Sequence, residues 1–301
     1  MKINRLMMVL ALVFPGMVAF SQAQSYAFKV VANKGNNEVK SGDSWQPVKT
    51  GATLKSTDEV KVADNAYIGL FHASGKPMEL KAAGSYKVSA LESQVSAGGS
   101  SVLNKYTDFI LSSNSEEKKN KLSATGAVHR GTADAISVML PSNQYSSVYN
   151  NVAVIRWESE KAKGPYIVNI VNMFGDNVAR IETADTRIEL NLNDSRFTDL
   201  SALLIEVSAK ADAKQVSDQY LIKRLSPADQ EKVKKSLSEI ATDVSERTAL
   251  NQFVLAGFYE EKGLLIDAIA AYEETIRLAP DVPFYAEAYN DFLIRQGLKK
   301  K

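Results

Sequence analysis

Few residues of this 301-residue chain have the type and spacing that catalysis or metal binding requires. The chain has no cysteine, which excludes disulfides, thiolate zinc sites and thiol redox chemistry. Its two histidines, His72 and His129, are too few and too far apart in the sequence to indicate a metal site. It also lacks the Gly-x-Ser-x-Gly, His-Glu-x-x-His and Gly-x-x-x-x-Gly-Lys-[Ser/Thr] patterns of known catalytic and phosphate-binding sites. We therefore predict no metal and no cofactor.

The carboxylates offer no clear acid–base pair either. Glu260-Glu261 and Glu273-Glu274 fall on expected helices, where a run of charge is interpreted as a solvated face. The loop Asp194–Asp199, which contains Ser195, is typical of turn chemistry rather than catalysis. A Ser–His dyad using His72 stays open as the site of an unrecognised enzyme, but a position at the end of a strand favours a structural role. The sequence thus predicts a protein that is not an enzyme.

Composition places the chain among globular proteins and sets limits on its partners. It is 45% hydrophobic and 24% charged, and its length is enough for two or three domains. The 36 basic and 35 acidic residues give a net charge of +1. Because so small a charge produces no long-range field that would gather phosphates, we predict no nucleic-acid partner.

The first 23 residues have the order of a secretory signal. Lys2 and Arg5 precede an apolar run, Leu6–Phe20, and Ser21-Gln22-Ala23 puts small residues at a cleavage site after Ala23. An uncleaved membrane anchor is the alternative, but the run is shorter than the roughly 20 residues that span a bilayer. We expect an exported protein, periplasmic or associated with the outer envelope, with no transmembrane segment in the mature chain.

Residues 26–91 have the alternation of a compact β-domain of about six short strands. Ala66, Ile68 and Leu70 alternate with Tyr67, Gly69 and Phe71, and Tyr86 and Val88 repeat the pattern. A period of two residues predicts half-buried strands, and Gly and Asn between the runs predict turns.

The same stretch resembles the FecR-type periplasmic domain. Trp45, Gly51, Leu54 and Gly75 follow the order of that family, together with Asp58-Glu59-Val60 and the apolar run Ala66–Phe71. The chain lacks the cytoplasmic domain and internal membrane helix of the FecR regulator. The resemblance therefore implies the module alone, with no catalytic residue and no regulatory role.

Residues 92–134 are predicted to connect this domain to the next. Val102, Tyr106, Phe109 and Ile110 have helical spacing, so we expect an amphipathic helix over Ser101–Leu111. The rest of the connector is polar. We interpret the pair His129-Arg130 as part of a surface turn, and binding of an anionic ligand is the alternative.

Residues 135–225 have the regular strand spacing of a β-sandwich. Six strands are predicted: Val152–Trp157, Tyr166–Met173, Val178–Thr183, Arg187–Leu192, Ala202–Ala209 and Tyr220–Leu225. Trp157 at the end of one strand and Tyr166 at the start of the next resemble a fibronectin type III or immunoglobulin-like domain. We predict that Trp157 fills the core, with carbohydrate stacking as the alternative.

Residues 226–301 are predicted to form a helical unit. Ser226-Pro227-Ala228-Asp229 has the pattern of a helix start, and helices are expected to about Ile240, over Arg247–Lys262, over Leu264–Leu278 and over Phe284–Arg295. The middle pair resembles a tetratricopeptide (TPR) repeat, with Thr275 as a departure from the usual Ala. The residues that carry the resemblance are Leu255, Ala256, Tyr259, Gly263, Ala268, Tyr272 and Pro280.

These segments together predict a multidomain α+β protein with two all-β modules followed by a TPR-like helical bundle, each packed separately. One repeat cannot bury its apolar face, so flanking helices must complete the bundle. The sequence leaves open whether this unit is purely structural or offers a groove to a partner. We expect a non-catalytic envelope adaptor that binds another protein. A ligand or glycan binder using the β-module loops is the alternative. The partner and the oligomeric state stay open.

Overall fold

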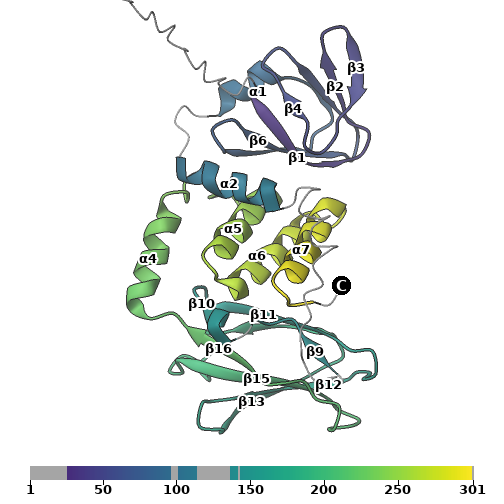
Figure 1. The fold of residues 1–301 in the computed structure, drawn as a ribbon. Helices are drawn as coiled ribbons and strands as arrows, with labels where there is room; N and C mark the ends of the chain where they lie inside the picture. The colour runs from purple at the N-terminus through teal and green to yellow at the C-terminus, as the bar shows by residue number, and fades with distance from the viewer. Residues whose placement is uncertain (1–25, 96–100, 114–135, 142, 300–301) are drawn as a thin grey trace, which may run out of the picture.

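The computed structural model describes residues 26–95, 101–113, 136–141 and 143–299, and over these residues the protein is a mixed α+β structure. Figure 1 shows a helical layer between two β-units. The coarse prediction of an α+β fold with β-rich parts and a helical part is thereby confirmed. The predictions for the signal segment with Ala23 and for His129 fall outside the described residues.

The first β-unit consists of two four-stranded sheets that enclose an apolar core. One sheet has the order β4-β1-β6-β7 and the other β3-β2-β5-β8. The strands are β1 (Phe28–Lys34), β2 (Glu38–Ser41), β3 (Ser44–Pro47), β4 (Thr53–Leu54), β5 (Glu59–Val62), β6 (Tyr67–His72), β7 (Pro77–Leu80) and β8 (Gly84–Lys87). This unit thus contains eight short strands, whereas about six were expected.

Strand β6 is buried on both faces, which corrects the expectation of a half-buried strand. Ile68 and Leu70 face the core of the first β-unit, whereas Tyr67 and Phe71 belong to the core of the helical layer. The side chains on both faces of this strand are apolar. Burial of the second face depends on the helical layer, which is distant in the sequence. A second correction concerns Val88, which starts the short helix α1 (Val88–Gln94) instead of ending a strand.

The second β-unit is a sandwich of a five-stranded sheet, β10-β16-β15-β12-β13, and a three-stranded sheet, β14-β11-β9. All six predicted strands are present: β11 (Val152–Glu158), β12 (Tyr166–Val171), β13 (Asn177–Thr183), β14 (Arg187–Asn191), β15 (Ala202–Ala209) and β16 (Tyr220–Arg224). The short strands β9 (Ser137–Val138) and β10 (Ser147–Val148) and the 3-10 helix η1 (Asn143–Tyr145) were not expected. Trp157 fills the core as predicted, with its ring edge-on to Tyr166 at 5.5 Å between centroids.

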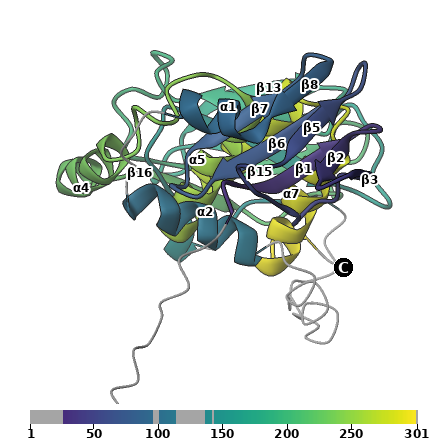
Figure 2. The ribbon, with the colours of Figure 1, turned by 90° about the horizontal axis from the view of Figure 1, so that it is seen from above.

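The helical layer combines C-terminal helices with one helix of the connector. It contains α2 (Ser101–Ser113), α5 (Ala249–Glu261), α6 (Leu265–Leu278) and α7 (Pro283–Arg295). The four helices predicted beyond residue 226 are confirmed, as is the connector helix. The first of the four, α4 (Pro227–Ser238), has no buried residue and runs along the side of the molecule (Figures 1 and 2).

Helix α2 completes the bundle by a close contact with α5. A Cβ atom on Gly257 would lie 2.4 Å from Ile110 Cγ1, so only glycine lets the two helices approach to this distance. Tyr106 of α2 also packs edge-on against Phe258, with 5.1 Å between ring centroids. The predicted need for flanking helices is therefore met from the connector on one side and from α7 on the other, where Tyr285 packs on Phe253.

The helical layer shares its core with the first β-unit, which differs from the expectation of separately packed units. One continuous cluster joins Val31, Tyr67 and Phe71 of the sheet to the helices. The hydroxyl groups of Tyr67 and Tyr285 lie 2.6 Å apart, and Glu79 Oε1 accepts hydrogen bonds from Tyr67 Oη (2.8 Å) and from the backbone N–H of Leu250 (2.7 Å). Within the described part of the chain, no helix has the length and hydropathy needed to cross a bilayer.

Candidate functional site

The candidate site is an open groove of about 870 Å³ between the helical layer and the sandwich. We call it the interlayer groove. Its lining comes from the segment before β11, from β11 and β14, from the approach to α5, and from α5 and α6. The residues are Asn150, Asn151, Val152, Val154, Arg187, Glu189, Arg247, Gln252, Leu255, Tyr259, Asp267, Ala270, Ala271, Glu273, Glu274, Ile276 and Arg277.

Helix α6 packs against β11, and the neighbouring strand β14 borders the groove. Strand β14 alternates, so Ile188 and Leu190 point into the sandwich core. Arg187 and Glu189 line the groove on the opposite face. Apolar side chains from both layers, including Val152 and Leu255, form part of the wall. The site therefore combines apolar surface with charged groups.

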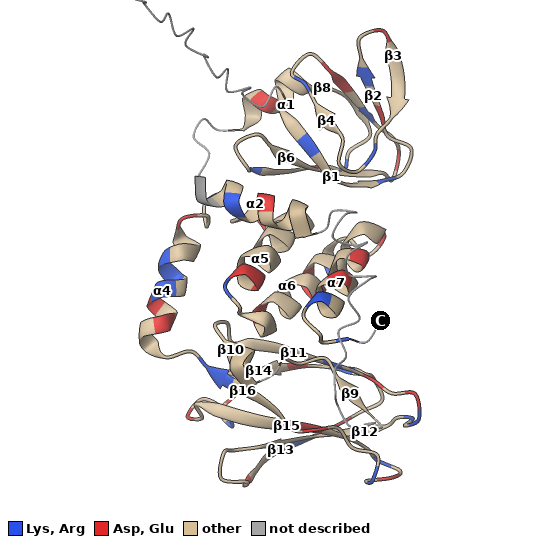
Figure 3. Cartoon of the chain, in the orientation of Figure 1, with Lys and Arg blue, Asp and Glu red and all other residues tan. Residues whose placement is uncertain are grey.

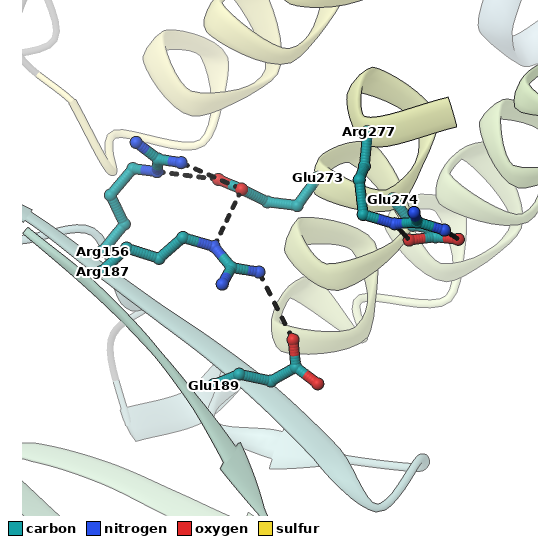
Figure 4. Close-up of polar contacts among 6 residues, drawn as sticks. All are labelled: Arg156, Arg187, Glu189, Glu273, Glu274 and Arg277. Atoms are coloured by element: carbon teal, nitrogen blue, oxygen red, sulfur yellow. Dashed lines mark hydrogen bonds and ion pairs between the residues drawn. The ribbon is translucent and has the colours of Figure 1, made fainter. Parts of the chain in front are cut away.

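Glu273 of α6 connects the two layers through a pair of arginines (Figure 4). Arg156 of β11 donates from Nε and Nη2 to its two carboxylate oxygens at 2.8 and 3.0 Å. Arg187 of β14 donates from Nε to Glu273 Oε2 at 3.2 Å, and its Nη2 lies 3.5 Å from Glu189. A bidentate guanidinium–carboxylate pair has a fixed geometry, so these bonds set the distance between α6 and the sheet.

Glu274 holds a second arginine pair at the rim. Arg277 donates to both of its oxygens at 2.7 and 2.8 Å, and Arg247 donates from Nε at 2.7 Å. The Arg277 guanidinium, followed by that of Arg247, keeps the pKa of Glu274 below its ordinary value. The Glu274 side chain is only 18% exposed, whereas Arg247 and Arg277 are 71% and 62% exposed. The rim therefore presents mainly guanidinium groups to water.

Asp267 is a buried carboxylate at the base of the groove. Its two oxygens accept the backbone N–H groups of Tyr149 and Asn150, both at 2.8 Å. Burial raises the pKa of this carboxyl to about 6, against the opposing effect of the two N–H donors. Both oxygens are engaged in holding the segment before β11 on α6, so Asp267 connects the layers.

Four of the seven TPR-like positions belong to the helical core, and one of these four, Tyr259, also lines the groove together with Leu255. Leu255 and Tyr259 face it from α5, and the Tyr259 hydroxyl accepts a hydrogen bond from Asn150 Nδ2 at 3.0 Å. Ala256, Ala268 and Tyr272 are buried in the core. Gly263 turns the chain between α5 and α6 with a φ of 71°, and Pro280 follows the end of α6.

The four FecR-like positions lie in the first β-unit, away from the lining of the groove. Trp45 is 38% exposed on β3, whereas Leu54 is buried on β4. Gly51 and Gly75 occupy turns with φ of 86° at both positions. A side chain at Gly75 would collide with Asn104 of α2, so this turn also contacts the helical layer.

His72 does contact a serine, but within a single turn. Its Nδ1 lies 2.7 Å from Ser74 Oγ and also accepts the Ser74 N–H at 3.1 Å. The imidazole packs edge-on against Phe28, and burial lowers its pKa. This nitrogen is thus occupied by its own turn. Asp194 likewise bonds the Arg196 side chain and backbone, as expected for turn chemistry.

The interpretation of the glutamate pairs as solvated faces is wrong, because none of the four side chains is more than 23% exposed. Glu260 is buried, with its side chain 2% exposed, and Arg295 of α7 donates to both its oxygens at 2.8–3.0 Å. Tyr272 also donates to it, at 3.2 Å. The Glu273 side chain is 10% exposed between two arginines. For Glu260, the nearly continuous apolar surface of α5 was the available signal, because a helix that is apolar all round is buried on every side.

Sequence reasoning missed the groove itself. The arginines that line it come from β14, from the approach to α5 and from α6, which are up to 90 residues apart, so no local pattern joins them. Among the described residues, no cluster of His, Asp or Glu has the arrangement of a metal site. No protein-family model matches this sequence, and no match is found among curated proteins.

Proposed function

We propose that the protein is a non-catalytic exported adaptor of the bacterial cell envelope, and that its interlayer groove receives a segment of a partner protein. The proposal of export depends on the signal-like order of residues 1–23. The single observation that supports binding is the groove itself. Its apolar wall and charged rim lie between two layers that hydrogen bonds of Glu273 and Asp267 join.

Three further assignments belong to this proposal. The first β-unit is proposed to be a FecR-like module, the sandwich a fibronectin- or immunoglobulin-like domain, and the α5–α6 hairpin a TPR-like repeat. In this interpretation the repeat contributes one wall of the groove through Leu255 and Tyr259. The two β-units would hold that wall in place and present it to the partner.

Substitutions in the groove test the proposal better than deletion of residues 226–301, because that deletion would remove the central core of the molecule. Gln252 lines the groove from α5, whereas Gln230 is exposed on α4. Gln252→Trp fills the groove, and Gln230→Trp is the matched control. In pull-downs from an envelope fraction, quantified by mass spectrometry, we expect a protein retained by wild type and the control to fall at least tenfold with Gln252→Trp.

A protein partner that is insensitive to Gln252→Trp, or the absence of any protein partner, would contradict the proposal.

The second candidate is a glycan or ligand binder that uses the β-unit loops. It is favoured by the exposed aromatic side chains Trp45 and Phe174, the latter 91% exposed in the turn between β12 and β13. Binding of polysaccharide that is lost with Phe174→Ala or Trp45→Ala, and kept with Gln252→Trp, would support this second candidate instead.

A further inference from the structure

The free edge of strand β14 borders the interlayer groove. Among the described residues, β14 is the last strand of its sheet and pairs only with β11. The free edge of a strand carries backbone N–H and C=O groups that have no partner in the sheet and can bond to another chain. The edge of β14 is therefore a place where another extended chain can form hydrogen bonds.

The register shows which residues of β14 present their backbone groups at that edge. The N–H of Trp157 donates to Thr186 O, and the N–H of Leu192 donates to Asn151 O. In an antiparallel ladder, hydrogen-bonded and non-hydrogen-bonded pairs alternate. Ile188 and Leu190 therefore bond to β11, and Arg187 and Glu189 direct their N–H and C=O groups outward, whereas the C=O of Asn191 accepts the N–H of Asp194 at 3.1 Å. Arg187 and Glu189 are also the β14 residues whose side chains line the groove.

The charge that faces water beside this edge is mainly positive. Arg187, Arg247 and Arg277 have side chains 37%, 71% and 62% exposed. The carboxylates that pair with them, Glu273 and Glu274, are 10% and 18% exposed. Glu189 is the exposed carboxylate of the lining, at 57%. Arg247 donates to Glu274 through Nε, so this hydrogen bond does not use its two terminal nitrogens.

We infer that the interlayer groove binds an extended acidic peptide segment as an additional strand on the edge of β14. The backbone of the segment pairs with Arg187 and Glu189, and its carboxylates meet Arg247 and Arg277 across the groove. Backbone pairing of this kind supplies affinity, and the charged and apolar walls supply selectivity. The inference rests on the proposed function, because it names the chemistry of the segment that the groove receives.

Two substitutions at one position separate backbone pairing from charge. Glu189→Pro removes the outward N–H of an edge strand, where proline is tolerated, without removing a ladder bond to β11. Glu189→Gln removes the charge and keeps the N–H. Circular dichroism and thermal unfolding show whether both variants stay folded. The arginines are tested by Arg247→Gln with Arg277→Gln, and Arg180→Gln on the exposed face of β13 is the control.

The probe is a random library of twelve-residue peptides, selected on the wild-type protein and resynthesised with a fluorescent label for anisotropy. We expect enriched peptides to be rich in Asp and Glu. Affinity should fall at least tenfold with Glu189→Pro and with the double arginine variant. It should be unchanged or higher with Glu189→Gln and unchanged with Arg180→Gln. If Glu189→Pro does not fold, the peptide is modified instead of the protein. Two peptides are made, one N-methylated at odd positions and one at even positions, and we expect one of them to bind the wild-type protein at least tenfold more weakly.

The inference is overturned if no peptide is enriched, if enriched peptides are neutral or basic, or if Glu189→Pro binds like Glu189→Gln. Binding of an anionic polysaccharide such as polygalacturonate, equally strong with Glu189→Pro, would assign the arginines to that ligand and also overturn strand addition. The same variants distinguish failure of this inference from failure of the proposed function. A partner lost with Gln252→Trp but retained with Glu189→Pro and the double arginine variant would keep the adaptor and refute only the acidic strand.

Discussion

Asp267 is a groove carboxylate that lies entirely out of contact with solvent. Its value to the fold comes from the two backbone N–H groups whose hydrogen bonds it accepts. Burial acts against this contribution by disfavouring the charged form. The balance between the two effects depends on pH, because only the charged form bears the desolvation cost.

We predict that Asp267→Ala destabilises the protein more at pH 5 than at pH 7. The substitution leaves the N–H groups of Tyr149 and Asn150 without this acceptor, which costs about 2 kcal/mol. Because the folded pKa of about 6 lies above the unfolded value, the folded state binds the proton more tightly. The stability from this group is full below the unfolded pKa and is lost as pH rises through 6. Wild type should therefore gain about 1 kcal/mol between pH 7 and pH 5 that the variant does not.

Urea unfolding of both proteins at the two pH values measures this difference. The Asp267 contribution is isolated by comparing the change between pH 7 and pH 5 in wild type with the change in the variant, since all other titrating groups are shared. Equal changes in the two proteins would show that the pKa of Asp267 is not raised in the folded state.

At the scale of elements, the contact between α2 and α5 decides how the connector joins the helical layer. Gly257 lies inside α5, where glycine costs about 1 kcal/mol relative to alanine. Helix propensity alone would therefore favour an alanine here. The packing opposes it, because a Cβ atom would lie 2.4 and 2.7 Å from two side-chain carbons of the buried Ile110.

We predict that Gly257→Ala destabilises the protein by about 1–3 kcal/mol, since overpacking a tight core costs more than the propensity gain. Ile110→Ala removes both colliding carbons, so Gly257→Ala should not destabilise the Ile110→Ala background. Urea unfolding of the two single variants and the double variant gives the coupling energy. Additive effects would mean that α2 does not pack this closely on α5.

At the scale of the molecule, the last part of the chain lies between the two parts that precede it. The core of the helical layer includes Val31 and Tyr67 of the first β-unit and Val154 of the sandwich. A continuous core of this kind couples the unfolding of its parts, whereas units joined only by linkers unfold separately. Figure 3 shows that charged residues of both signs are spread over all three layers, so no single-sign surface separates one unit from another.

We predict that the three layers unfold in one transition. The chain has two tryptophans, Trp45 in the first β-unit and Trp157 in the sandwich, so Trp157→Phe and Trp45→Phe each leave a reporter in one β-unit. For each variant, the urea midpoint from fluorescence should match the midpoint of its own helical signal from circular dichroism. A fluorescence transition at a clearly different urea concentration would instead indicate β-units that unfold independently of the helical layer.

The sequence by itself determined the local elements. Period-two alternation located the six main strands of the sandwich, and helical spacing with Ser226 and Pro227 located the helices beyond residue 226. These signals are reliable because they depend on one face of an element being buried, whichever neighbour buries it. The burial of Trp157 in the sandwich core was also predicted, whereas its contact with Tyr166 was not.

Only the tertiary structure decided what lies against what. The second buried face of β6, the burial of Glu260 and Glu273, and the closeness of Gly257 to Ile110 all depend on partners far away in the sequence. The interlayer groove depends on them too, since its walls come from elements whose contact is set by three-dimensional packing. The pattern of one segment records that a surface must be covered, and carries no information about which distant segment covers it.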